Sequence, residues 1–166
     1  MEFETKIISR QIGDLLYASG FTLGTAESCT GGLVSEAIIA TPGASDYFKG
    51  SVVSYTDEVK EKLLKVSREV LDERSAVCEE VAREMARGVM ELLDVDYAIA
   101  STGIAGPGGG TKDVPVGTIW LAYGNREEIR TMRLTEDFGR DINIAIATNK
   151  AMRLLLSFLQ EKLPKE

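Results

Sequence analysis

Residues 21–40 have the sequence FTLGTAESCTGGLVSEAIIA, and this stretch decides how the chain is organised. The apolar and β-branched residues from Phe21 to Ala26 predict a strand, and Leu33 to Ala40 have helical spacing. A strand that turns sharply into a helix exposes the residues of the turn beside free backbone N–H groups. The sequence therefore predicts a nucleophile, Ser28 or Cys29, next to a site for an anion.

The rest of the chain alternates between predicted helices and strands. Periodicity and capping residues predict helices at residues 4–19, 57–66, 75–93 and 142–159, and Thr30 or Cys29 is expected to cap the helix at 33–40. Further strands are predicted at 48–55, 96–101, 118–123 and 128–134, with a tight turn at 124–126 and a Gly/Pro-rich loop at 103–117. This order predicts a single α/β domain over residues 1–166, with one mixed sheet and helices on both faces.

The composition excludes several classes of function. The chain of 166 residues has a formal net charge of −7, which argues against a nucleic-acid partner. It has no histidine and two cysteines, so His-based metal sites and Ser-His-Asp triads are ruled out, and a disulfide framework is not expected. No apolar run has membrane-spanning length, and the first residues are acidic, unlike a signal peptide. We expect a cytoplasmic protein without a metal, a cofactor or a membrane partner.

Three hydroxyl groups are predicted at one edge of the sheet. Ser28, Tyr55 and Thr102 each lie just past the end of a predicted strand. If these strands are parallel, the hydroxyls converge where α/β sheets bind ligands. Tyr55 and Thr102 could then support a nucleophile and its base or donate to an oxyanion, or they could be ordinary strand-end residues.

Ser28 needs a neighbour that accepts its proton before it can act as a nucleophile. Because histidine is absent, Lys60 is the best-placed base: it lies in the first turn of a predicted helix, where the helix dipole and partial burial lower a lysine pKa. On spacing alone, an exposed surface lysine is the alternative. Cys29 is either a rival nucleophile or a small packing residue, and Glu27 either orients Lys60 or substrate or caps the next helix.

Two glycine-rich segments would let the backbone approach a ligand closely, although flexible turns are the alternative. Neither is followed by the Gly-Lys-Ser/Thr of a phosphate-binding P-loop. An arginine near the start of the last helix could clamp a phosphate or lie on the surface. The candidate substrate-binding residues are Thr30, Gly31, Gly32, Gly106, Gly108, Gly109 and Arg140.

Three segments together resemble the CinA C-terminal domain family, which includes stand-alone nicotinamide-nucleotide amidases. They are TAESCTGG at 25–32, SYTDEVK at 54–60 and TGIAGPGG at 102–109, in the same order as in the family. The resemblance implies a three-layer α/β/α sandwich of the anticodon-binding-domain type with a five-stranded mixed sheet. It also implies a homo-oligomer.

The resemblance further implies hydrolysis of the carboxamide of nicotinamide mononucleotide to nicotinate mononucleotide and ammonia, in pyridine-nucleotide salvage. Ser28 matches the nucleophile of the family, and Lys60 matches its base. Tyr55 and Thr102 match supporting residues. No cofactor is implied, and the substrate is a small nucleotide.

Two positions depart from the family pattern. Asp57 stands where the family often has Asn, which adds a negative charge close to the proposed base. Arg140 precedes Asp141, whereas the late arginine of the family usually follows Gly-Asp. The alternatives to an amidase with a Ser–Lys pair are a non-catalytic nucleotide-binding or regulatory module and a cysteine amidase.

Overall fold

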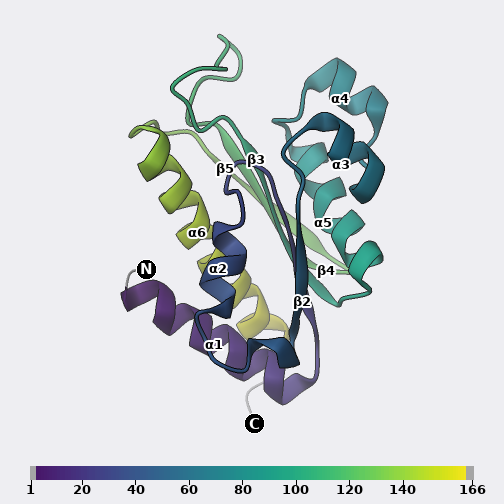
Figure 1. Cartoon of the computed structure of the whole chain (residues 1–166), viewed down its shortest axis with the longest axis vertical. Helices are drawn as coiled ribbons and strands as arrows, with labels where there is room; N and C mark the ends of the chain where they lie inside the picture. The colour runs from purple at the N-terminus through teal and green to yellow at the C-terminus, as the bar shows by residue number, and fades with distance from the viewer. Residues whose placement is uncertain (1–2, 164–166) are drawn as a thin grey trace.

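One sheet organises the computed structural model, which describes residues 3–163 (Figure 1). Its five strands have the order β2-β1-β3-β4-β5. β1 pairs in parallel with β2 and β3, whereas β4 pairs antiparallel with both β3 and β5. The carboxyl ends of β2, β1 and β3 therefore share one edge of the sheet, called the carboxyl edge below. The strands are β1 (Leu23–Glu27), β2 (Phe48–Val53), β3 (Tyr97–Gly103), β4 (Ile119–Asn125) and β5 (Ile129–Leu134).

Helices cover both faces of this sheet. One face carries α1 (Phe3–Ser19), α2 (Leu33–Ile39) and α6 (Arg140–Lys162), and the other carries α3 (Asp57–Leu64), α4 (Arg68–Arg74) and α5 (Glu79–Leu93) (Figure 1). A short 3-10 helix, η1 (Ala44–Asp46), precedes β2. A buried apolar cluster fills each interface between helices and sheet. The predicted three-layer sandwich with a five-stranded mixed sheet is confirmed.

α6 is the one helix of residues 3–163 that is long and apolar enough to cross a membrane, judged by length and composition only. Met152, Leu155 and Leu159 of this helix are fully buried in the core, whereas Ile142 and Ile146 near its start are exposed. The hydropathy of this helix is therefore explained by its packing against the sheet.

Two boundaries differ from the prediction for local reasons. β1 begins later than expected because both the N–H and the hydroxyl of Thr22 donate to the carboxylate of Asp96, each at 2.9 Å. The hairpin turn comes after Asn125, whose side-chain oxygen accepts the N–H groups of Glu127 and Glu128 at 3.0 and 2.8 Å. Polar side chains thus decide where these strands begin and end.

The prediction was wrong in the segment before α5. The helix expected from Ser75 begins at Glu79, and Cys78 is its N-cap. Ser75 instead ends α4, with a φ of 67°. α4 was missed because it has seven residues, of which Leu71 is buried, so it shows too little periodicity.

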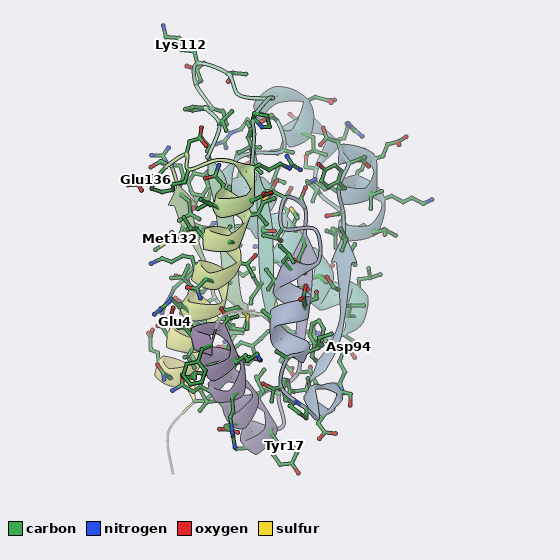
Figure 2. The ribbon with its side chains drawn as sticks, turned by 60° about the vertical axis from the view of Figure 1, so that its left-hand side comes forward. Glu4, Tyr17, Asp94, Lys112, Met132 and Glu136 are labelled. Atoms are coloured by element: carbon green, nitrogen blue, oxygen red, sulfur yellow. The ribbon has the colours of Figure 1, made fainter. Side chains whose placement is uncertain are left out.

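Two features fix the surroundings of the carboxyl edge. α3 packs so closely on α5 that a Cβ atom at Gly88 would collide with the backbone of Leu64. The loop between β3 and β4 projects beyond the strands and carries Lys112 at its far end (Figure 2). α3 and this loop therefore flank the same edge of the sheet.

Candidate active site

Ser28 and Lys60 form a hydrogen-bonded pair at the carboxyl edge. Ser28 directly follows β1, and Lys60 lies near the start of α3. The Nζ atom of Lys60 lies 2.9 Å from the Oγ atom of Ser28 and 2.8 Å from the carbonyl oxygen of Ser54. The exposed fraction is 1% for Lys60 and 7% for Ser28. The pair has the geometry of a nucleophile with its adjacent base.

The surroundings of Lys60 favour its neutral form. Burial lowers the pKa of Lys60 below its ordinary value of 10.5, because an ammonium loses its hydration inside the protein. The negative charge of Asp57 opposes this effect and raises the pKa. Since burial is the larger cause, a larger fraction of Lys60 than of a surface lysine is neutral at a given pH, and only the neutral amine can accept a proton.

Glu27 caps α2 from inside the protein. Its carboxylate accepts the N–H groups of Gly32, Val34 and Ser35 at 3.2, 2.9 and 3.0 Å. It also accepts the hydroxyls of Thr30 at 2.7 Å and Ser35 at 2.6 Å. These bonds hold the turn between β1 and α2 in one conformation.

This cap corrects two expectations, and of the two alternatives for Glu27 it supports the helix cap. The N-cap position of α2 is Gly32, with a φ of 106° that favours glycine, and neither Thr30 nor Cys29 caps the helix. The start of α2 is not an open anion site, because the Glu27 carboxylate occupies it. Glu27 has an exposed fraction of 0% and points at the helix, so it neither orients Lys60 nor faces a substrate.

Cys29 is a packing residue in this structure. It is buried in the same apolar cluster as Val34 and Ile38. Burial raises the pKa of its thiol to about 11, so the thiol stays protonated at neutral pH. The geometry therefore favours Ser28 over Cys29 as the nucleophile.

The turn after Ser28 offers candidate donors for an oxyanion. The N–H of Gly31 donates to the carbonyl of Ser28 at 3.1 Å, and Gly31 has a φ of 58°. Within residues 3–163, the N–H groups of Cys29 and Thr30 take no part in the hydrogen bonds that hold this turn. They are therefore the N–H groups beside Ser28 that could stabilise a developing negative charge.

Arg140, Tyr55 and Gly106 form a second cluster beside the pair. Arg140 begins α6, and its guanidinium donates to the carbonyl of Gly106 at 2.7 Å and contacts the Tyr55 hydroxyl at 3.5 Å. Tyr55 is 63% exposed and directly follows Ser54, which accepts a hydrogen bond from Lys60. The structure thus brings together two predicted binding elements, the arginine and the glycine loop, from distant parts of the chain.

Three other predicted residues make no hydrogen bond to the Ser28–Lys60 pair. The hydroxyl of Thr102 is buried and donates to the carbonyl of Ala76 at 2.8 Å, so it anchors the segment before α5 instead of supporting the pair. A Cβ atom at Gly108 would meet no atom within 4 Å, and Gly109 has a φ of 87°. Both glycines belong to the projecting loop.

The row of residues across the carboxyl edge includes a serine that the sequence analysis missed. Strand pairing continues past the strand ends: Ser54 N–H donates to the Glu27 carbonyl at 2.8 Å, and Ser28 N–H donates to the Ser101 carbonyl at 3.0 Å. The next row is therefore Ser54, Ser28 and Thr102. Ser54 stands beside Ser28.

Within the described part of the chain the structure gives no metal site, and one of its cavities lies away from the pair. Among residues 3–163, no group of three or more Cys, Asp or Glu side chains could hold a metal ion. A cavity of about 800 Å³ lies between α1, α2 and α6, on the opposite face of the sheet from α3. Its lining includes Leu33, Ile142 and Arg153 but neither member of the pair.

The fold and site define an α/β/α sandwich with a buried serine–lysine pair at the ends of parallel strands. The chain belongs to the CinA C-terminal domain family, whose model matches residues 5–159. It is 42% identical to a CinA-like protein of Amoebophilus asiaticus, over 96% of this chain and 38% of that protein. It is 39% identical to the nicotinamide-nucleotide amidohydrolase PncC of Shewanella oneidensis, over 90% of this chain and 37% of that protein.

Solved structures agree with this assignment. The crystal structure of a competence/damage inducible protein from Agrobacterium tumefaciens matches with a TM-score of 0.93 and 32% identity, over 96% of this chain and 98% of that chain. The chain spans 38% and 37% of the length of the two relatives named above.

Proposed function

We propose that this protein hydrolyses the carboxamide of nicotinamide mononucleotide, giving nicotinate mononucleotide and ammonia. The observation that carries the proposal is the 2.9 Å contact between Ser28 Oγ and the buried Nζ of Lys60. The name of the Shewanella relative, nicotinamide-nucleotide amidohydrolase, supports the choice of substrate.

The reaction proceeds through an acyl-enzyme. Neutral Lys60 accepts the proton of Ser28 while Oγ attacks the carboxamide carbon. The N–H groups of Cys29 and Thr30 stabilise the oxyanion. Protonation of the nitrogen releases ammonia and leaves an ester on Ser28. Lys60 then deprotonates the water that hydrolyses this ester.

The second cluster binds the rest of the nucleotide. The planar donor fork of Arg140 suits a phosphate, and the backbone of Gly106, Gly108 and Gly109 can approach the ribose-phosphate closely. The ring of Tyr55 is exposed, so it is available to face the positively charged pyridinium ring.

Ammonia release from nicotinamide mononucleotide by the purified protein tests this proposal, with nicotinate mononucleotide measured alongside. Ser28→Ala and Lys60→Ala should each lower turnover at least about 1,000-fold without unfolding the protein. Cys29→Ala should retain most of the turnover. Loss of turnover in Cys29→Ala alone would move the nucleophile to the thiol.

A non-catalytic nucleotide-binding module is the second candidate, because the Arg140–Tyr55–Gly106 cluster does not depend on the Ser28–Lys60 pair. Binding of the nucleotide without any ammonia release would favour the module. The homo-oligomer and the cytoplasmic location stay predictions.

A further inference from the structure

Two buried side-chain hydroxyls of residues 3–163, those of Ser54 and Tyr47, have no hydrogen-bond partner. A buried hydroxyl without a partner destabilises a protein, so each case calls for an explanation. Tyr47 lies in the core below α1, where its ring packs against Gly13. Ser54 lies beside the proposed nucleophile and has an exposed fraction of 0%.

Strand geometry places the Ser54 side chain on the same face as Lys60. Side chains alternate along a strand, and Val52 packs into the cluster of α3 and α5 while Val53 approaches Gly32 on the other face. Ser54 therefore returns to the face of α3. Neighbouring strands lie about 4.8 Å apart, so Ser54 is the immediate neighbour of Ser28 in the row.

Once it has accepted a proton, Lys60 has more donors than partners within the described residues. A lysine ammonium has three N–H donors. Two partners are present, Ser28 Oγ and the carbonyl of Ser54. Ser54 supplies the second partner through its carbonyl and also carries the unpaired hydroxyl. A rotation of the Ser54 side chain changes the direction in which this hydroxyl points.

We propose that the Ser54 hydroxyl is a proton relay between Lys60 and the leaving nitrogen of the substrate. This inference rests on the proposed function. In the tetrahedral intermediate, Lys60 is an ammonium that holds the proton of Ser28. As the C–N bond breaks, its electron pair goes to nitrogen, and Ser54 Oγ gives its proton to that nitrogen and takes one from Lys60 Nζ. Ammonia leaves, the carbonyl and the Ser28 ester form, Lys60 is neutral, and Ser54 is a hydroxyl again.

The unpaired state of the hydroxyl suits this task. A hydroxyl held by a strong acceptor in the resting protein would have to break that bond before it could turn to the substrate. Ser54 Oγ has no such bond to break. The missing hydrogen bond destabilises the resting protein, and the Ser54 hydroxyl gains hydrogen-bond partners at the step in which the C–N bond breaks.

Ser54→Ala tests the relay, with Tyr47→Phe as the matched control because it removes the other unpaired hydroxyl. Both variants should unfold at the same urea concentration as the parent or higher, since neither loses a hydrogen bond. Ser54→Ala should lower kcat for nicotinamide mononucleotide about 100-fold with little change in KM, the size of a general-acid contribution. Tyr47→Phe should keep kcat, and Ser54→Thr should restore most of it.

A nitrophenyl ester of nicotinate mononucleotide separates the relay from other roles, because its phenolate departs without a proton. Ser54→Ala should hydrolyse this ester almost as fast as the parent. Undiminished ammonia release in Ser54→Ala, or an equal loss on amide and ester, would overturn the relay while leaving the Ser28–Lys60 pair intact. A parent protein that releases no ammonia would overturn the proposed function itself, and the relay with it.

Discussion

At the scale of single residues, the burial that lowers the pKa of Lys60 also lowers the stability of the folded protein. Burial lowers the pKa of Lys60 from its ordinary 10.5, so the folded protein binds this proton less tightly than the unfolded chain does. When the pH is below the pKa that Lys60 has in the folded protein, burial of the ammonium lowers the free energy of unfolding by its full amount. This opposition disappears as the pH rises from the folded pKa towards 10.5.

Lys60→Met should therefore stabilise the protein while abolishing ammonia release. Methionine has a similar shape and no charge to desolvate, and we expect the free energy of unfolding at pH 7 to rise by about 1 kcal/mol. Urea denaturation of the parent and the variant at pH 7 and pH 10 measures this change. The difference between their free energies of unfolding should be smaller at pH 10. A less stable variant at pH 7 would show that the hydrogen bonds of Lys60 outweigh its desolvation.

Asp57→Asn should move the acidic limb of the pH profile of kcat/KM to lower pH. The Asp57 charge raises the pKa of Lys60, so its removal makes the base available at lower pH. Because Asp57 is exposed and screened by solvent, the shift should be small. Glu58→Gln is the control and should leave the limb in place. A limb that does not move in Asp57→Asn would show that Lys60 is not the group being titrated.

At the scale of secondary-structure elements, α2 depends on a carboxylate from the preceding strand. Glu27→Gln keeps the size of the side chain but loses the charged acceptor of three helix N–H groups. The free energy of unfolding should fall by about 2 kcal/mol, measured by urea denaturation. Glu36→Gln, an exposed change in the same helix, should have almost no effect. Equal stabilities of the two variants would contradict this account of the cap.

The contact between α3 and α5 should control activity from a distance. Gly88→Ala adds a methyl group against the backbone of Leu64 and must push α3 away, carrying Lys60 with it. We expect a loss of about 2 kcal/mol in stability and a lower kcat. Arg87→Ala, on the exposed face of α5, should change neither. Normal ammonia release by Gly88→Ala would show that α3 can shift without displacing Lys60 from Ser28.

Local sequence patterns were enough to predict most helices and strands, and they were enough to predict Ser28 but not the position of Lys60 beside it. The abrupt change from strand to helix at Ser28 was visible in the sequence, whereas the role of Lys60 depended on the family resemblance. Its distance from Ser28 is set by the packing of α3 on α5, which no local pattern encodes. Ser54 was missed because the predicted strand ended at Tyr55, while β2 ends at Val53.

At the scale of the whole molecule, the candidate site draws on both helical layers. Lys60 comes from α3 on one face of the sheet, and Arg140 comes from α6 on the other. A nucleotide that contacts both residues would bridge the two layers. Ligand binding should therefore stabilise the complete fold rather than one element.

Ser28→Ala allows this effect to be measured without turnover. Nicotinamide mononucleotide at 100 times its Kd should raise the free energy of unfolding by about 2.7 kcal/mol. The same ligand concentration should stabilise the Ser28→Ala, Arg140→Ala double variant less. Equal stabilisation of both would place the phosphate away from Arg140.

The close packing of α3 on α5 also has a consequence for a chain that is still being synthesised. Ser28 and Lys60 both leave the ribosome before α5 does, because α5 begins at Glu79. Before α5 is synthesised, α3 cannot pack against Gly88. Lys60 is then exposed to water, and we expect it to have the pKa of a surface lysine. The pKa of Lys60 should therefore fall below that of a surface lysine only after α5 has been synthesised and has packed against α3.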